Sequence, residues 1–175
     1  ARFTAGFRRL VSEGRVFEQA FYPYLNTVTC AGHATLGTGA WPKTHGIILN
    51  EWYRRELGRV RSCTADEATT PVQYGGVPEK ESHSARELRA PSLAERLRQR
   101  WPGSRSVSLA VKPRSAVMMA GTGATAVTWV GADGWQTSTA YASGPVAEVM
   151  RALGPRPFER ERGLVWERLL PEASY

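Results

Sequence analysis

The sequence is short of the residues that build most metal sites. Its 175 residues include two Asp, three His and two Cys. No C-x-x-C or H-E-x-x-H pattern brings them together. Apolar runs are also short, since stretches such as residues 116–120 stay far below the roughly 20 residues that span a bilayer. The sequence therefore predicts no membrane-spanning helix, and it contains neither of these two metal-binding motifs.

Lysine is scarce as well, with three residues, yet the chain carries a net charge of +7 because of its many Arg residues. A basic chain suits an anionic partner, either phosphate esters or nucleic acid. The Arg residues are scattered and usually have Glu neighbours, so a solvated Arg-rich surface is the simpler interpretation. The apolar fraction of 42% is that of a folded globular domain. The two cysteines permit one disulfide or two thiols, and their spacing does not decide between them.

Apolar periodicity and turn residues predict the secondary structure. The pattern predicts helices over residues 3–13, 30–39, 93–101 and 145–154. It predicts strands over residues 15–22, 46–49, 106–112, 127–130 and 135–139. Thr29 is expected to cap the second helix, and Ser92 with Glu95 to form a capping box on the third. Segment 64–91 is expected to be a surface excursion that covers a site. Helices that alternate with apolar strands favour an α/β architecture.

The most informative segment runs from Thr27 to Gly39 and is rich in small residues and hydroxyls. A hydroxyl at the start of a helix lies beside unpaired backbone N–H groups, which favour anions and help to stabilise an alkoxide. Small neighbours let the backbone approach a phosphate closely. By this chemistry alone, a small-residue turn packed against a sheet remains an equal alternative.

A longer pattern carries a resemblance. Residues 27–52 read T-x-[TS]-x-x-G-H-x-[TS]-x-x-T-G-x-x-P-x-x-H-G-I-x-x-N-x-W. This pattern resembles the nucleophile region of the type I phosphodiesterase/nucleotide pyrophosphatase group of the alkaline phosphatase superfamily. The resemblance implies that Thr29 is the nucleophile and Asn50 a phosphate-binding residue. It also implies one partial α/β/α sandwich over residues 1–175, the N-terminal portion of a larger catalytic domain.

A second resemblance points to one branch of that superfamily. Lys112 and Arg114 follow a predicted strand, where alternate residues point the same way, so both are expected to face one pocket. The monoesterase branch with a Thr nucleophile has such a Lys-x-Arg pair on the phosphoryl oxygens. A charged strand end lying in solvent is the alternative.

The resemblance implies hydrolysis of phosphate monoesters at a two-zinc site, through a phosphothreonine intermediate on Thr29, which also ligates metal. A phosphodiesterase or nucleotide pyrophosphatase of the same superfamily is the first alternative. A non-catalytic, basic, anion-binding domain is the second, although no nucleic-acid motif supports it. A small phosphate ester is therefore the expected partner, and no nucleic acid is expected. Exported relatives imply a periplasmic or secreted location.

The remaining candidate ligands do not complete a metal site. His33 and His45 lie at motif positions that the family does not use as ligands, and both are expected to be structural. Asp133 falls in a predicted hairpin turn, while Asp66 and His83 receive no role. The missing ligands are expected outside this chain, which would then be an internal fragment that is inactive alone and binds zinc weakly or not at all.

Cys30 raises a separate possibility, since a Cys at a helix start can act as a nucleophile. A thiol hydrolase using Cys30 is disfavoured, because the resemblance assigns that role to Thr29. A Cys30–Cys63 disulfide stays an even alternative to two free thiols.

Overall fold

The structure is a computed structural model that describes residues 6–75, 77–132, 134–143, 145–153, 163–165 and 167. It forms two units, residues 24–162 and a smaller unit of residues 1–23 with 163–175. The smaller unit contains α1 (Gly6–Glu13), in which Arg9 and Glu13 form an exposed ion pair at 2.8 Å and no residue is buried. The predicted helix is confirmed over its described part, but the predicted strand at 15–22 is not formed.

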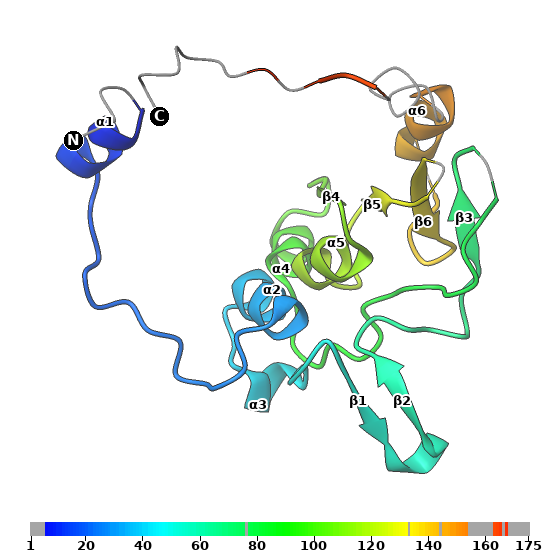
Figure 1. Ribbon diagram of the computed structural model, residues 1–175, viewed down its shortest axis with the longest axis horizontal. Coiled ribbons are helices and arrows are strands. Elements are labelled where there is room, and N and C mark those ends of the chain that lie inside the picture. Colours follow the sequence, from blue (N-terminus) through cyan, green and yellow to red (C-terminus); the bar gives the residue numbers. More distant parts are fainter. Residues whose placement is uncertain are drawn as a thin grey trace. The chain divides into compact units, whose positions relative to one another are not determined.

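A four-stranded sheet organises the larger unit (Figure 1). Its order is β3 (Pro71–Gln73), β6 (Trp135–Ser138), β5 (Ala126–Val130) and β4 (Val107–Ala110). Strands β4 and β5 are parallel and are joined through α5 (Pro113–Ala120), as a parallel connection requires. The β5–β6 hairpin is confirmed, with Trp129 opposite Gln136. Its predicted turn residue Asp133 lies outside the described residues.

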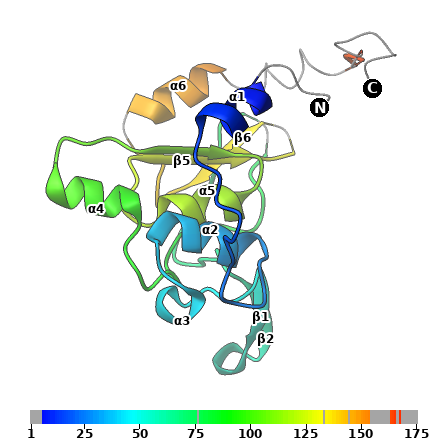
Figure 2. The same ribbon diagram turned by 90° about the vertical axis from the view of Figure 1, so that its left-hand side faces the viewer.

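Helices cover both faces of the sheet (Figure 2). On one face lie α2 (Thr29–Thr38), α4 (Leu93–Arg100) and α5, and on the other lies α6 (Pro145–Leu153). The main core includes Ala34 from α2, Val117 from α5 and Trp129 from β5. A smaller core joins Tyr74 to Met150 of α6. The α/β/α arrangement expected from the sequence is therefore present. None of the helices in the described ranges is long and apolar enough to cross a bilayer.

The capping box of α4 is confirmed. The Ser92 hydroxyl accepts a hydrogen bond from the Glu95 N–H at 3.3 Å, and the Glu95 carboxylate accepts one from the Ser92 N–H at 2.7 Å. The Ser92 hydroxyl also donates to the carbonyl of Ala120 at 2.7 Å, which ties the start of α4 to the end of α5. This one sequence signal therefore sets both a helix boundary and a tertiary contact.

The predicted strand at 46–49 is wrong. Helix α3 (Pro42–His45) ends at Gly46, whose φ of 81° turns the chain away from an extended course. Ile47 is buried, but its N–H donates to Nδ1 of His45 at 3.1 Å rather than to a strand. Beyond it, β1 (Glu51–Arg54), the 3₁₀ turn η1 (Arg55–Leu57) and β2 (Arg59–Ser62) form a two-stranded hairpin that projects beyond α3 in Figure 1.

Segment 64–91 lies on the surface only in part. Residues 77–81 are exposed, whereas residues 64–66 and 82–85 are buried. Polar side chains are tolerated there because they bond to one another: Ser84 donates to the Asp66 carboxylate at 2.6 Å. The Ser84 N–H also bonds to the carbonyl of Thr64 at 2.8 Å. The expectation of a surface excursion is thus wrong for residues 64–66 and 82–85.

Candidate active site

Thr29 is the first residue of α2, not its cap. Val28 takes the extended cap conformation (φ −76°, ψ 168°) and offers no side-chain cap, so the predicted cap position was wrong by one residue. Among the described residues, no group hydrogen-bonds the Thr29 hydroxyl. Thr29 therefore keeps a half-buried, uncommitted hydroxyl at the positive end of the helix dipole.

The side chain of Asn50 takes the capping role on α2. Its Oδ1 accepts a hydrogen bond from the backbone N–H of Cys30 at 2.8 Å. This N–H is one of the first-turn donors that the helix itself leaves unsatisfied. The Cys30 N–H donates, so the side-chain atom of Asn50 that faces it must be the oxygen. The two N–H donors on Nδ2 of Asn50 therefore remain available to another acceptor. The structure therefore brings the amide of Asn50 to the residue next to Thr29.

The disulfide that the sequence left open is present between Cys30 and Cys63. Cys63 follows strand β2, and its backbone N–H donates to the carbonyl of Asn50 at 2.9 Å. Both cysteines are fully buried in the main core. A thiol nucleophile at Cys30 is therefore excluded in this state, because its sulfur is bonded.

Lys112 and Arg114 begin a helix instead of ending a strand. Strand β4 stops at Ala110, Lys112 is the cap of α5, and Pro113 is its first residue, a position that proline favours. The predicted strand alternation is therefore wrong as the reason for a shared pocket. Lys112 is exposed and Arg114 half-buried, and neither forms an ion pair with any described residue.

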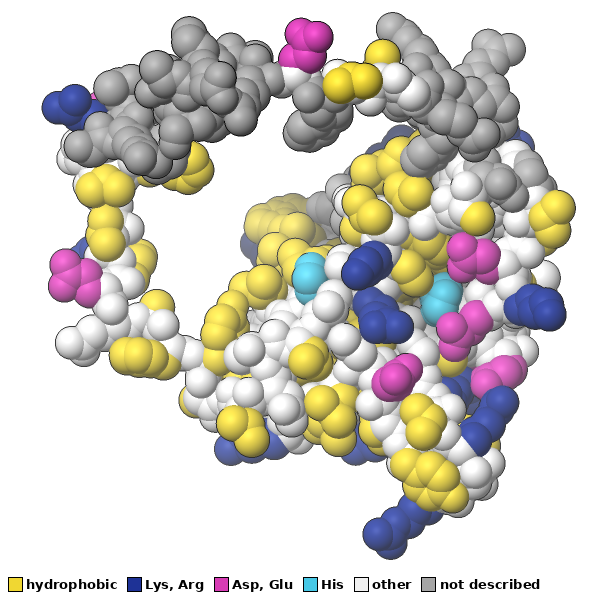
Figure 3. All heavy atoms as spheres, in the orientation of Figure 1, with side chains coloured by type: hydrophobic (Ala, Val, Ile, Leu, Met, Phe, Trp, Pro, Cys, Tyr) yellow, Lys and Arg dark blue, Asp and Glu magenta, His cyan; other side chains and the backbone are white. Residues whose placement is uncertain are grey.

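Helices α2 and α5 pack against each other and approach most closely near Gly37. A Cβ on Gly37, near the end of α2, would lie 2.7 Å from the carbonyl oxygen of Met118, near the end of α5. The last turns therefore touch, and Figures 1 and 2 show the two helices side by side. Thr29 and the two cations belong to the other ends of these helices, since Thr29 is the first residue of α2, Lys112 caps α5 and Arg114 is its second residue. Figure 3 shows Lys and Arg side chains gathered beside His side chains on one face.

His83, which the sequence left without a role, lies within the electrostatic reach of Arg114. It is buried, packs edge-on against Trp129 with ring centroids 5.5 Å apart, and hydrogen-bonds Thr64 at 3.0 Å. Burial, with a smaller effect of the Arg114 charge, lowers the pKa of His83 to about 4. His83 is therefore neutral at pH 7. No spacing pattern in the sequence could have indicated this proximity.

The other two histidines have structural contacts, as expected. Nδ1 of His33 donates to the carbonyl of Thr29 at 2.8 Å. The imidazole of fully buried His45 accepts from the Ile47 N–H through Nδ1, so its Nε2 donates to the hydroxyl of Thr35 at 3.1 Å. Burial lowers the pKa of His45.

The described residues do not fit a complete zinc centre. Within the described part of the chain, no three His, Cys, Asp or Glu side chains gather in a way that could hold a metal ion. Asp66 is bonded to Ser84 and to the guanidinium of Arg86, and both cysteines are in the disulfide. Thr29 could serve as one ligand, so further ligands would have to come from outside these residues.

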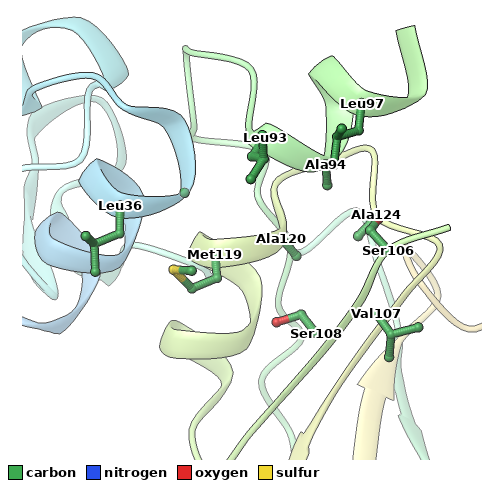
Figure 4. Close-up of a pocket in the computed structure, with 11 residues that line it drawn as sticks. Leu36, Leu93, Ala94, Leu97, Ser106, Val107, Ser108, Met119, Ala120 and Ala124 are labelled. Atoms are coloured by element: carbon green, nitrogen blue, oxygen red, sulfur yellow. The ribbon is translucent and has the colours of Figure 1, made fainter. Parts of the chain in front are cut away.

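A cavity of about 250 Å³ lies at the far end of the same helix pair (Figure 4). Leu36 comes from the end of α2, Leu97 from α4 and Met119 from the end of α5. Its lining is mainly apolar, and it includes neither Thr29 nor Asn50, Lys112 or Arg114. The cavity is therefore separate from the group of candidate site residues.

The fold is an α/β/α domain, and comparison with known proteins shows the family to which it belongs. The family described as type I phosphodiesterase / nucleotide pyrophosphatase matches residues 1–163, and the chain belongs to this family. It is similar to alkaline phosphatase PhoK from Sphingomonas sp., with 38% identity over 132 residues, which are 74% of this chain and 23% of that protein.

Solved structures agree with the sequence relatives. The crystal structure of alkaline phosphatase PafA matches with a TM-score of 0.71 and 30% identity, over 85% of this chain and 29% of that one. A diesterase is also similar: venom phosphodiesterase 2 from Crotalus adamanteus is 33% identical over 50% of this chain and 10% of its own length. The chain thus spans about a quarter of the length of the alkaline phosphatases that it matches.

Proposed function

We propose that this chain supplies the nucleophile and the phosphoryl-binding residues of a larger phosphate monoesterase. The observation that carries the proposal is the hydrogen bond from the Cys30 N–H to Oδ1 of Asn50, at 2.8 Å. It holds the side-chain amide of Asn50 against the first turn of the helix that Thr29 begins. In this proposal Thr29 is the nucleophile, and Asn50, Lys112 and Arg114 bind the phosphoryl group.

The spacing of these four residues supports the assignment. A crystallised variant of PafA carries replacements of one Thr, one Asn, one Lys and one Arg, separated in turn by 21, 62 and 2 positions. The same separations and residue types run from Thr29 through Asn50 and Lys112 to Arg114. That these positions were chosen for replacement together in a similar enzyme supports a common role here.

The charges at the start of α5 also support an anionic ligand. Two cations at a helix N-terminus oppose the positive end of the dipole, so as purely structural residues they are unfavourable. Neither cation forms an ion pair with a described carboxylate. An anionic phosphoryl group bound between Lys112, Arg114 and the helix start would be attracted to both cations and to the helix dipole. The unfavourable repulsion would thus be replaced by a favourable interaction.

The proposed reaction has two displacements. The Thr29 hydroxyl oxygen forms a bond to phosphorus, the ester P–O bond breaks, and the leaving alcohol takes up a proton. Water then attacks the phosphothreonine, which releases inorganic phosphate and restores the hydroxyl. In both steps the Asn50 amide, Lys112 and Arg114 balance charge on the equatorial oxygens.

The cations favour a monoester over a diester. A dianionic monoester gains more from two positive charges than a monoanionic diester does, and Arg can grip two oxygens at once. The similarity to a venom phosphodiesterase keeps diester hydrolysis as the second candidate. A non-catalytic anion-binding domain is the third candidate, and the matched enzymes disfavour it.

Further features of the complete enzyme belong to the same proposal. Two Zn²⁺ ions are proposed there, held by Thr29 and by ligands outside this chain, so the chain alone should be inactive and should bind zinc weakly. A zinc titration that gives two equivalents bound tightly by this chain would contradict it. A periplasmic or secreted location is proposed from the alkaline phosphatase relatives.

The substrate class is tested by comparing an aryl phosphate with its methyl diester, using the complete enzyme. Arg114→Ala should lower kcat/KM about 100-fold for the monoester, because a charge-assisted bidentate contact is lost, and clearly less for the diester. Arg114→Lys keeps the positive charge but not the bidentate hydrogen bonding of the guanidinium. Its kcat/KM for the monoester should lie between those of the wild type and Arg114→Ala. Equal losses on both substrates would contradict the monoester assignment.

A further inference from the structure

We infer that the Cys30–Cys63 disulfide is a positioning element of the phosphoryl site, because it fixes the amide of Asn50 relative to Thr29. This inference rests on the proposed function. It concerns two residues that the family pattern does not assign. Two hydrogen bonds meet at Asn50, and the disulfide joins the two residues that donate them.

The bonds form a closed ring through Asn50. Its side-chain Oδ1 accepts from the Cys30 N–H at 2.8 Å, and its backbone carbonyl accepts from the Cys63 N–H at 2.9 Å. The two donor residues are joined to each other by the disulfide. Asn50 is therefore held at both its side chain and its backbone by residues that cannot separate from each other.

The disulfide also joins two parts of the fold that have different anchors. Cys30 belongs to α2, which packs in the main core with α5. Cys63 follows the β1–β2 hairpin, whose first residue Glu51 directly follows Asn50 and pairs with Ser62. Without the bridge, only the two hydrogen bonds at Asn50 would remain of this ring. The amide would then have no covalent link that fixes its position against the first turn of α2.

A small shift of this amide should matter, because a misplacement of about 1 Å in a site can cost about 100-fold in rate. The hairpin has a second anchor that does not touch the amide. Glu87 forms ion pairs with Arg54 at 3.1 Å and Arg61 at 3.3 Å, all three largely buried. The contacts of Glu87 therefore provide a matched control on the same hairpin.

The test is a double-mutant cycle in the complete enzyme, read as kcat/KM for an aryl phosphate and as inhibition by inorganic phosphate. The bridge is removed by Cys30→Ala/Cys63→Ala, with the Ser/Ser pair as a second version. Removal should lower kcat/KM about 10- to 100-fold and weaken phosphate inhibition. In an Asn50→Ala background the same removal should change kcat/KM by less than about threefold, because the two changes act through one group.

Glu87→Gln is the control, and it should leave kcat/KM within about threefold while lowering the melting temperature. Additive effects of Asn50→Ala and bridge removal would overturn the inference, as would failure of both cysteine pairs to fold, since the bridge would then serve the whole fold. An active Thr29→Ala variant would instead overturn the proposed function. The two failures are thus distinguishable.

Discussion

The first turns of α2 and α5 differ in chemistry from the last turns of the same two helices. At the first turns lie Thr29, Lys112 and Arg114, with Asn50 bonded to the helix start, and their polar groups are largely uncommitted. At the last turns, backbone meets backbone at Gly37, beside a mainly apolar cavity. The unpaired N–H groups of the first turns follow from the polarity of the helix, whereas the close packing of the last turns depends on the absence of a side chain at Gly37.

The comparison predicts that changes at the first turns alter activity, whereas changes at the last turns alter stability. The largest effect is expected for Thr29→Ala, which removes the proposed nucleophile. We expect kcat/KM to fall by at least about 10³-fold in the complete enzyme, or roughly 4 kcal/mol, with little change in the melting temperature. Thr29→Ser keeps a hydroxyl and should retain far more activity. If kcat/KM of Thr29→Ala lies within tenfold of the wild-type value, the proposed difference between the first and last turns is wrong.

The next largest effect is a loss of stability at acidic pH, caused by protonation of His83 near Arg114. Its pKa of about 4 in the folded protein lies below the ordinary value of 6.5, so below pH 6.5 the unfolded chain binds the proton more readily. The free energy of unfolding should therefore fall as the pH drops from 6.5 toward 4, by about 3 kcal/mol at most from this residue.

Urea unfolding at pH 7 and pH 4.5 measures this loss. In His83→Gln, which carries no titrating group there, the difference between the two pH values should shrink. An unchanged difference would show that the acid sensitivity arises elsewhere, for instance at His45, whose pKa burial also lowers.

The smallest effect is expected at the last turns. Gly37→Ala would place a Cβ 2.7 Å from a backbone oxygen, and the strain should lower the free energy of unfolding by about 1–3 kcal/mol. Gly32→Ala in the same helix meets nothing within 4 Å and should be neutral or stabilising. Chemical denaturation compares the two variants. If Gly37→Ala leaves stability intact but lowers kcat/KM, the proposed division between the ends is wrong.

Much of the fold could be predicted from local signals. The capping box at Ser92 and Glu95, the β5–β6 hairpin and the α/β/α class each depend on patterns within a few residues, and all are present. The strand expected at 46–49 failed because a buried apolar run resembles a strand, while Gly46 and His45 set a different backbone course.

The candidate site was harder to predict in its geometry than in its residues. The motif indicated Thr29 and Asn50, but only the structure shows the bond through Cys30. The Lys-x-Arg pair was expected on a strand, although Pro113 is a favourable first residue of a helix. The approach of His83 to Arg114 and the pairing of the cysteines join distant parts of the chain, which no local pattern encodes.

The central claim, that the Thr29 oxygen attacks phosphorus, has one direct measurement. The complete enzyme is mixed with an aryl phosphate, quenched in acid during turnover, and the peptide containing Thr29 is analysed by mass spectrometry. We expect a phosphoryl group on Thr29 that forms and is lost at rates at least as fast as the measured turnover. Phosphate found on another residue, or turnover with no labelled peptide under conditions that preserve phosphothreonine, would contradict it.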